Sequence, residues 1–157
     1  EYVVGKMLSL TEKNYNDQIL RETLWNSKAL SSDVTAALNP VFKSVHDVEN
    51  AARLSYGLAF AKYTGSRGKV MANDADAEFI QEIRQIFDKN DIKYQSGGFG
   101  KVDEGGGGTV AKFLAYYGIR TIDAGPSLLS MHSLFEISSK ADLYETYRAY
   151  KVFFELK

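Results

Sequence analysis

The apolar positions of this chain recur at three- and four-residue intervals in four stretches, and this spacing predicts helices. The clearest stretch follows a capping residue at Asn73 or Asp74 and carries its apolar stripe over residues 79–87. Ser139 is placed to cap the stretch over residues 143–154. We expect each stripe to face a core. The other three stretches are residues 14–25, 110–117 and 143–154.

Shorter apolar runs bounded by turn residues predict strands between these helices. The runs cover residues 57–65, 92–95 and 119–124, and turns are expected at Asn39-Pro40, over residues 65–74 and at Gly125-Pro126. The first ten residues could form a strand or be the remainder of a longer chain. Strands alternating with helices predict the α/β class: a layered sheet, at least partly parallel, with helices on both faces.

Four consecutive glycines, Gly105–Gly108, stand before Thr109 and a predicted helix. Glycine adopts positive φ and lets the backbone approach a ligand closely, so this loop can present N–H groups. One interpretation is a module that binds phosphate or another anion. A G-x-x-x-x-G-K-[ST] motif is missing, and Lys112 falls inside the helix, which weighs against it. The same N–H groups could instead hold a substrate or a developing oxyanion.

Three polar residues are candidates for chemistry. His132 follows an apolar run after the Gly125-Pro126 turn, and we expect a packed backbone to fix its imidazole. From the pattern alone, a histidine in such a place is more often structural than a ligand. Asp33, in a Ser-Ser-Asp sequence, would by itself be interpreted as a cap or a turn residue. His46 lies beside Asp47 and Glu49, but the spacing matches no H-E-x-x-H helix, so we predict a surface position.

Composition narrows the classes of function. A chain of 157 residues with 45% hydrophobic content predicts one globular domain. A net charge of -1 favours neither nucleic acid nor an anionic membrane as partner. Cysteine is absent, so any metal ion must be held by histidine and carboxylates. No apolar run approaches the ~20 residues that span a bilayer, and no basic start leads into an apolar segment, so we expect a cytoplasmic protein.

Several motifs together resemble the aminopeptidase I / aspartyl aminopeptidase family of dinuclear zinc exopeptidases. The longest is GGGGTVAKFLAYYGIRTIDAGPSLLSMHSLF and the sequence after it, and the match continues upstream in ALSSDVTAALNP, KYTGSRGK and NDADAEF. In that family the His of the SMHS motif and the Asp before the Asn-Pro turn are zinc ligands. The resemblance implies these roles for His132 and Asp33. It also implies that residues 1–157 form the C-terminal segment of a metallopeptidase catalytic domain.

The resemblance implies further partners. Family members use a Lys near the substrate at the position of Lys62, and the glycine loop would add substrate contacts from Gly106, Gly107, Gly108 and Thr109. A peptide substrate, two zinc ions per complete site with Mn²⁺ or Co²⁺ as alternatives, and a homo-oligomer are all implied. Ala36 stands where the aspartyl branch has a His that recognises acidic side chains, which puts acidic specificity in doubt.

Other parts of such an enzyme are missing from this chain. The family needs a further His, a bridging Asp and a Glu-Glu pair that supplies a base and a ligand, and these normally lie upstream of Asp33. No Glu-Glu pair occurs here. Two ligands fall short of the three that a catalytic zinc usually has, and no base takes a proton from water. We expect the rest of the catalytic domain, in a longer protein or on a second chain, to supply them, and this chain alone to be inactive. A catalytically dead homologue is the alternative.

Overall fold

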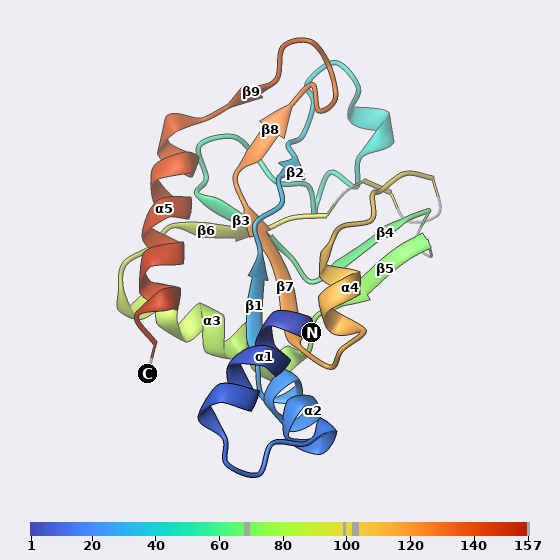
Figure 1. Ribbon diagram of the computed structural model, residues 1–157. Coiled ribbons are helices and arrows are strands. Elements are labelled where there is room, and N and C mark those ends of the chain that lie inside the picture. The colour runs from blue at the N-terminus through green and yellow to red at the C-terminus, as the bar shows by residue number, and fades with distance from the viewer. Residues whose placement is uncertain (68–69, 99, 102–103, 157) are drawn as a thin grey trace.

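A computed structural model describes residues 1–67, 70–98, 100–101 and 104–156, and its centre is a four-stranded sheet (Figure 1). The strand order is β1-β7-β3-β6. β1 is parallel to β7 and β3 is parallel to β6, whereas β3 and β7 are antiparallel. The partly parallel sheet expected from the sequence is confirmed. Its strands are β1 (Lys28–Ser31), β7 (Arg120–Gly125), β3 (Leu58–Ala61) and β6 (Tyr94–Ser96).

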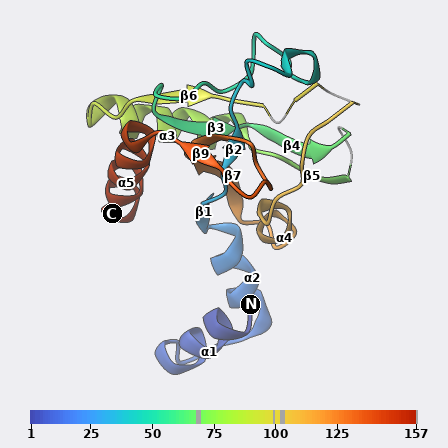
Figure 2. The same cartoon turned by 90° about the horizontal axis from the view of Figure 1, so that it is seen from above.

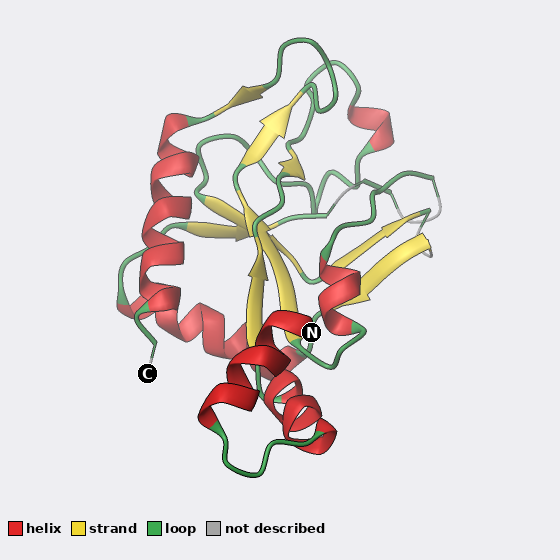
Figure 3. Cartoon of the chain, in the orientation of Figure 1, coloured by secondary structure: helices red, strands yellow, loops and turns green. Residues whose placement is uncertain are grey.

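Helices cover both faces of this sheet, as predicted (Figures 1 and 3). α3 (Ala77–Lys89) and α5 (Lys140–Phe154) lie on one side, and the short α4 (Ala111–Ala115) lies on the other. The main core forms under α3 and α5, because the apolar stripe of α3 meets the apolar side of the strands there. Its largest members are Leu58, Phe60, Phe79, Ile83, Phe87 and Ile122.

Two smaller sheets flank the central one. The first has the order β2-β8-β9, with β2 at Thr35–Ala36, β8 at Ser127–Leu129 and β9 at Ile137–Ser138. The second pairs β4 (Tyr63–Ser66) with β5 (Val70–Asp74). The sequence predicted one strand over residues 57–65 and a turn over residues 65–74. The structure divides that strand at Lys62, whose carbonyl accepts a hydrogen bond from the Ala75 N–H at 2.8 Å. Residues 68–69 of the predicted turn are outside the described part.

Residues 2–11 form a helix, so a strand there is wrong. α1 (Tyr2–Thr11) and α2 (Asp17–Trp25) form a hairpin that projects from the rest of the fold (Figure 2). The Asn16 side chain caps α2 by accepting from the Gln18 N–H at 2.9 Å. The apolar stripe of α2 was expected to pack on a sheet. It packs against α1 instead, where Leu20 lies over Gly5.

Two predicted stripes are also wrong in direction. On α5 the buried side carries Asp142, Thr146 and Ala149, whereas Leu143, Tyr147 and Phe154 are exposed. The wholly buried Asp142 decides this orientation, because its carboxylate accepts the backbone N–H groups of Ser55 and Gly57, both at 2.8 Å. α4 likewise buries Ala111 and exposes most of its predicted stripe. Apolar spacing alone does not show such a polar anchor.

Candidate functional site

Asp33 lies in the connection between β1 and β2 and is partly buried. Its Oδ1 accepts a hydrogen bond from the Val34 N–H at 2.9 Å. Gly125, at the end of β7, packs directly on the Asp33 backbone: a β-carbon on Gly125 would lie 2.2 Å from the Asp33 carbonyl oxygen. The backbone that carries the Asp33 carboxylate is therefore braced by the neighbouring strand.

His132 occupies an exposed turn between β8 and β9. The prediction that a packed, extended segment fixes it is wrong, because β8 ends at Leu129. The turn is shaped by the backbone instead: His132 has φ of 67°, and its N–H donates to Glu136 Oε1 at 2.6 Å. Positive φ is uncommon for a residue with a β-carbon. The imidazole is consequently held out toward solvent, where a ligand can reach it.

The two candidate ligands suit zinc in chemical kind. A carboxylate oxygen and an imidazole nitrogen are donors that Zn²⁺ takes in sites without cysteine. Among the residues that the structure describes, however, no group of three or more histidine and acidic side chains is arranged to hold a metal ion. The described chain thus offers donors of the right type without a complete coordination shell.

Lys62 lies between β3 and β4, and its ammonium group forms an ion pair with Asp74. Both side chains are more than half exposed. Such a pair is screened by water and is expected to contribute at most ~1 kcal/mol to stability. Breaking the ion pair with Asp74 therefore costs little stability, so the Lys62 ammonium group can exchange Asp74 for another partner.

The glycine loop is docked along the edge of β4. The Gly65 N–H donates to the Gly107 carbonyl at 2.9 Å, and the Arg67 N–H donates to the Gly105 carbonyl at 2.7 Å. These contacts fix the loop in an extended path beside the strand.

Two of the glycines are required by this packing. A β-carbon on Gly106, which has φ of 96°, would lie 2.4 Å from the Gly65 carbonyl oxygen. One on Gly108 would lie 2.0 Å from Met71 Cβ. A cavity of about 200 Å³ borders the loop at Gly105 and Gly106. The helix after the loop has only five residues and hence a weak dipole. This weighs against the interpretation that the glycine loop binds phosphate or another anion.

A buried carboxylate at the centre of β7 was missed by the sequence analysis. Asp123 is 3% exposed, and its Oδ2 accepts the Thr109 hydroxyl at 2.9 Å. The hydroxyls of Ser31 and Thr64 lie beside the same carboxyl group without reaching hydrogen-bond geometry. Burial raises the pKa of Asp123, and the three hydroxyl groups oppose that rise. An acidic residue in the middle of a predicted strand was the available signal.

His46 is buried, so the predicted surface position is wrong. It follows the short 3₁₀ helix η1 (Lys43–Val45), and its Nε2 accepts the Asn39 N–H at 3.3 Å. Burial lowers the pKa of the imidazole, which favours the neutral form that can accept this bond. His46 closes the loop that begins at the predicted Asn39-Pro40 turn and has a structural role there.

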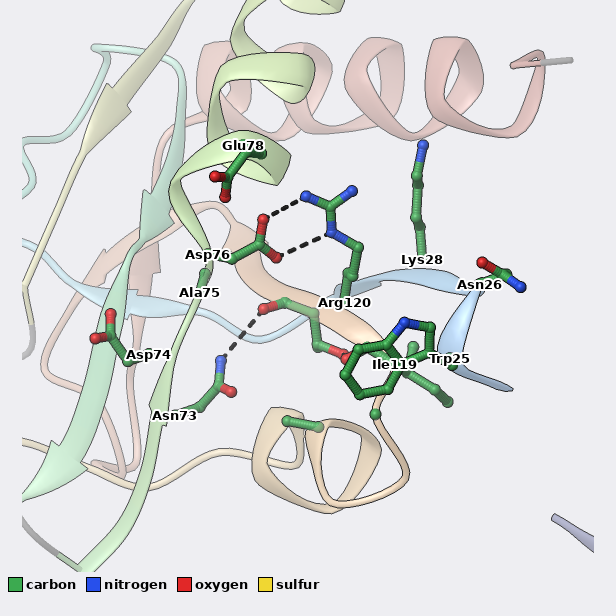
Figure 4. Close-up of a pocket in the computed structure, with 13 residues that line it drawn as sticks. Trp25, Asn26, Lys28, Asn73, Asp74, Ala75, Asp76, Glu78, Ile119 and Arg120 are labelled. Atoms are coloured by element: carbon green, nitrogen blue, oxygen red, sulfur yellow. Dashed lines mark hydrogen bonds and ion pairs between the residues drawn. The ribbon is translucent and has the colours of Figure 1, made fainter. Parts of the chain in front are cut away.

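A large cleft, shown in Figure 4, lies at the beginnings of β1 and β7, whereas Asp33 follows the end of β1. It has a volume of about 700 Å³ and is lined by Trp25 and by the first residues of β1 and β7. Arg120 crosses it to bind Asp76, with Nε to Oδ2 at 3.1 Å and Nη2 to Oδ1 at 2.5 Å (Figure 4). These hydrogen bonds hold the pKa of Asp76 below its usual value. None of the candidate site residues lines this cleft.

Comparison with known proteins identifies the class. The family model described as aminopeptidase I zinc metalloprotease (M18) matches residues 1–154. A probable M18 family aminopeptidase 1 from Borrelia garinii subsp. bavariensis is 58% identical over 156 residues, which are 99% of this chain and 34% of that protein. Its counterpart from Thermotoga maritima is 50% identical over 150 residues, which are 96% of this chain and 33% of that protein.

Solved structures agree with the sequence match. The crystal structure of the M18 aminopeptidase from Thermotoga maritima superposes with a TM-score of 0.91 at 49% identity, over 96% of this chain and 34% of that one. The S. cerevisiae mApe1 dodecamer matches with a TM-score of 0.71 at 23% identity, over 92% of this chain and 30% of that one, and shows the shared fold.

This chain belongs to the M18 family of zinc aminopeptidases. It spans about a third of the length of the curated relatives that it matches. No helix in the described part of the chain is long and apolar enough to cross a membrane.

Proposed function

We propose that this chain is the C-terminal part of the catalytic domain of a zinc aminopeptidase and carries two of its metal ligands, Asp33 and His132. The observation that carries the proposal is the match to the M18 family along residues 1–154, which includes both residues. The structure is compatible with it, because the Asp33 backbone is braced by Gly125 and the His132 side chain is exposed. Two zinc ions per complete site, with Mn²⁺ or Co²⁺ as alternatives, belong to the same proposal.

The chemistry is metal-assisted hydrolysis of the peptide bond after an N-terminal residue. Bound zinc supplies a Lewis acid for the scissile carbonyl and lowers the pKa of a water molecule. The Asp33 carboxylate and the His132 imidazole would each hold an ion. Gly106 to Gly108 would bind the substrate backbone, and Thr109, which is 4% exposed, would hold the end of this loop. Lys62 would leave Asp74 to meet a polar group of the peptide.

The remaining ligands and the general base are not encoded here, since this chain has no Glu-Glu pair. We place them in the part of the protein that corresponds to the remaining two thirds of the relatives. Homo-oligomerisation is also proposed, with the mApe1 dodecamer as the supporting case. The single experiment that tests the function compares the complete gene product with this 157-residue chain, both purified free of other peptidases, on unblocked and N-blocked peptides.

The complete protein is expected to remove N-terminal residues from unblocked peptides in a zinc-dependent manner and to spare blocked ones. The 157-residue chain is expected to hydrolyse neither, with Zn²⁺, Mn²⁺ or Co²⁺ added. Turnover by the 157-residue chain would contradict the division of ligands, and an inert, metal-loaded complete protein would favour the catalytically dead homologue.

A further inference from the structure

Three segments that carry candidate site residues converge on one buried carboxyl group, that of Asp123. Ser31 in β1 stands two positions before Asp33, and it pairs with Asp123 in the parallel register of β1 and β7. Thr64 in β4 stands two positions after Lys62. Thr109 closes the glycine loop. All three present hydroxyl groups to the Asp123 carboxyl.

The contact with Thr109 is the one complete hydrogen bond of this cluster. The Thr109 hydroxyl donates to Asp123 Oδ2 at 2.9 Å, and its oxygen also lies 3.3 Å from the Ala111 N–H, which donates to it. Thr109 is 4% exposed. A bond to an ionised or ionisable partner in a buried place is stronger than a bond at the surface. This bond fixes the point where the glycine loop turns into α4.

The loop is thereby held at both ends of its course. The pairing of Gly105 and Gly107 with β4 fixes its path, and the Thr109 bond fixes its exit. β4 also approaches Asp123, through Thr64, which is 1% exposed. A shift of the Asp123 side chain would therefore be transmitted through Thr109 to the end of the loop.

We propose that Asp123 is a positioning residue, which through Thr109 fixes the substrate-binding glycine loop relative to the strand that leads to Asp33. This proposal rests on the function proposed above for the loop. Asp123 itself is too deeply buried to touch a peptide, so its effect on the reaction passes through Thr109. Loss of the bond is expected to weaken substrate binding before it affects the chemical step, because the loop and not a reacting group is displaced.

Two substitutions of Thr109 test the proposal, because a positioning role and a packing role predict opposite answers to which of them is more damaging. Thr109→Val keeps the shape and removes the hydroxyl, whereas Thr109→Ser keeps the hydroxyl and removes a buried methyl group. If the bond positions the loop, Thr109→Val in the complete enzyme raises KM by about tenfold, since a buried hydrogen bond to a carboxyl group is lost, and Thr109→Ser stays within about twofold. If Thr109 is only a packing residue, Ser is the more damaging change.

Thr146 provides the matched control, because it is an equally buried threonine whose hydroxyl bonds to the Asp142 carbonyl at 2.8 Å within α5. Thr146→Val and Thr146→Ser are expected to leave KM unchanged. Amide hydrogen exchange of residues 105–109 in the complete protein supplies a readout without substrate: exchange should become faster in Thr109→Val and stay near wild type in Thr109→Ser.

The two proposals fail in distinguishable ways. Unchanged loop exchange and unchanged KM in Thr109→Val, or a KM that follows melting temperature across the four variants, would overturn the positioning role alone. Absence of zinc-dependent peptidase activity in the wild-type enzyme would overturn the proposed function, and the exchange experiment would still decide whether the Asp123 bond holds the loop.

Discussion

The α-carbon of Gly125 lies against the carbonyl oxygen of Asp33, so close that a β-carbon on it would stand 2.2 Å from that oxygen. Gly125→Ala therefore has to push the Asp33 backbone away from β7. We predict that zinc content and peptidase rate of the complete enzyme both fall, the rate by tenfold or more, on the order of 1.4 kcal/mol in the barrier. Metal analysis and steady-state kinetics on the same preparation check this.

Gly98 is the matched control for this change. A β-carbon there would have its nearest neighbour, the Asn50 carbonyl oxygen, at 3.8 Å, an ordinary contact distance. Gly98→Ala should leave zinc content and rate unchanged. If Gly125→Ala were as active and bound as much zinc as Gly98→Ala, the contact of β7 with the Asp33 backbone would not be needed for zinc binding or activity.

The glycine loop contains its own matched pair. Gly108→Ala places a β-carbon 2.0 Å from Met71 Cβ, whereas the nearest atoms to a β-carbon on Gly105 are 3.9 Å away. Overpacking of this kind costs about 1–3 kcal/mol. Gly108→Ala should lower the free energy of unfolding by about that amount and raise KM, and Gly105→Ala should do neither. Equal behaviour of the two variants in denaturant titrations would contradict the docked position of the loop.

Stability should depend on pH through His46. Burial lowers its pKa in the folded state, and the unfolded value is about 6.5. As the pH falls below about 6.5, the unfolded chain binds a proton that the folded protein resists. The stabilising contribution is therefore fully present above that pH and is lost as pH falls toward the lowered folded pKa.

Urea titrations of the complete protein between pH 5 and pH 8 measure this effect. His46→Gln, which retains an acceptor for the Asn39 N–H but does not titrate, should flatten the pH dependence in the window below about 6.5. Asn14→Gln, a change at an exposed residue that does not titrate, is the control and should leave the slope as in wild type. A slope that survived unchanged in His46→Gln would contradict the role of the buried imidazole.

The sequence predicted the fold class, the helices α2 to α5 and much of the strands β3, β4, β6 and β7, because apolar periodicity and turn residues act locally. It did not predict α1 or β5. It failed where a buried polar side chain decides the packing. Asp142 turns α5 so that its predicted apolar stripe faces outward, and His46 lies inside a loop that looks polar. Both depend on partners distant in sequence or on loop geometry, which periodicity does not encode.

The candidate site also combines residues that could be predicted from the sequence with contacts that could not. Asp33 and His132 came from family resemblance, and pattern alone would have made them a turn residue and a structural histidine. The structure adds what neither approach contained: the close approach of Gly125 to Asp33 and the buried Asp123 beneath the glycine loop. These contacts join residues that are 92 and 14 positions apart in the sequence.

The central claim, that Asp33 and His132 are zinc ligands, is tested most directly by metal content. Zinc per protomer should be measured in the complete enzyme, together with melting temperature and peptidase rate, for Asp33→Ala, His132→Ala and the exposed-carboxylate control Asp17→Ala. Each ligand variant is predicted to lose zinc and most activity while it stays folded, and the control should match wild type. Full zinc and full activity in either ligand variant, with or without a lower melting temperature, would contradict the claim.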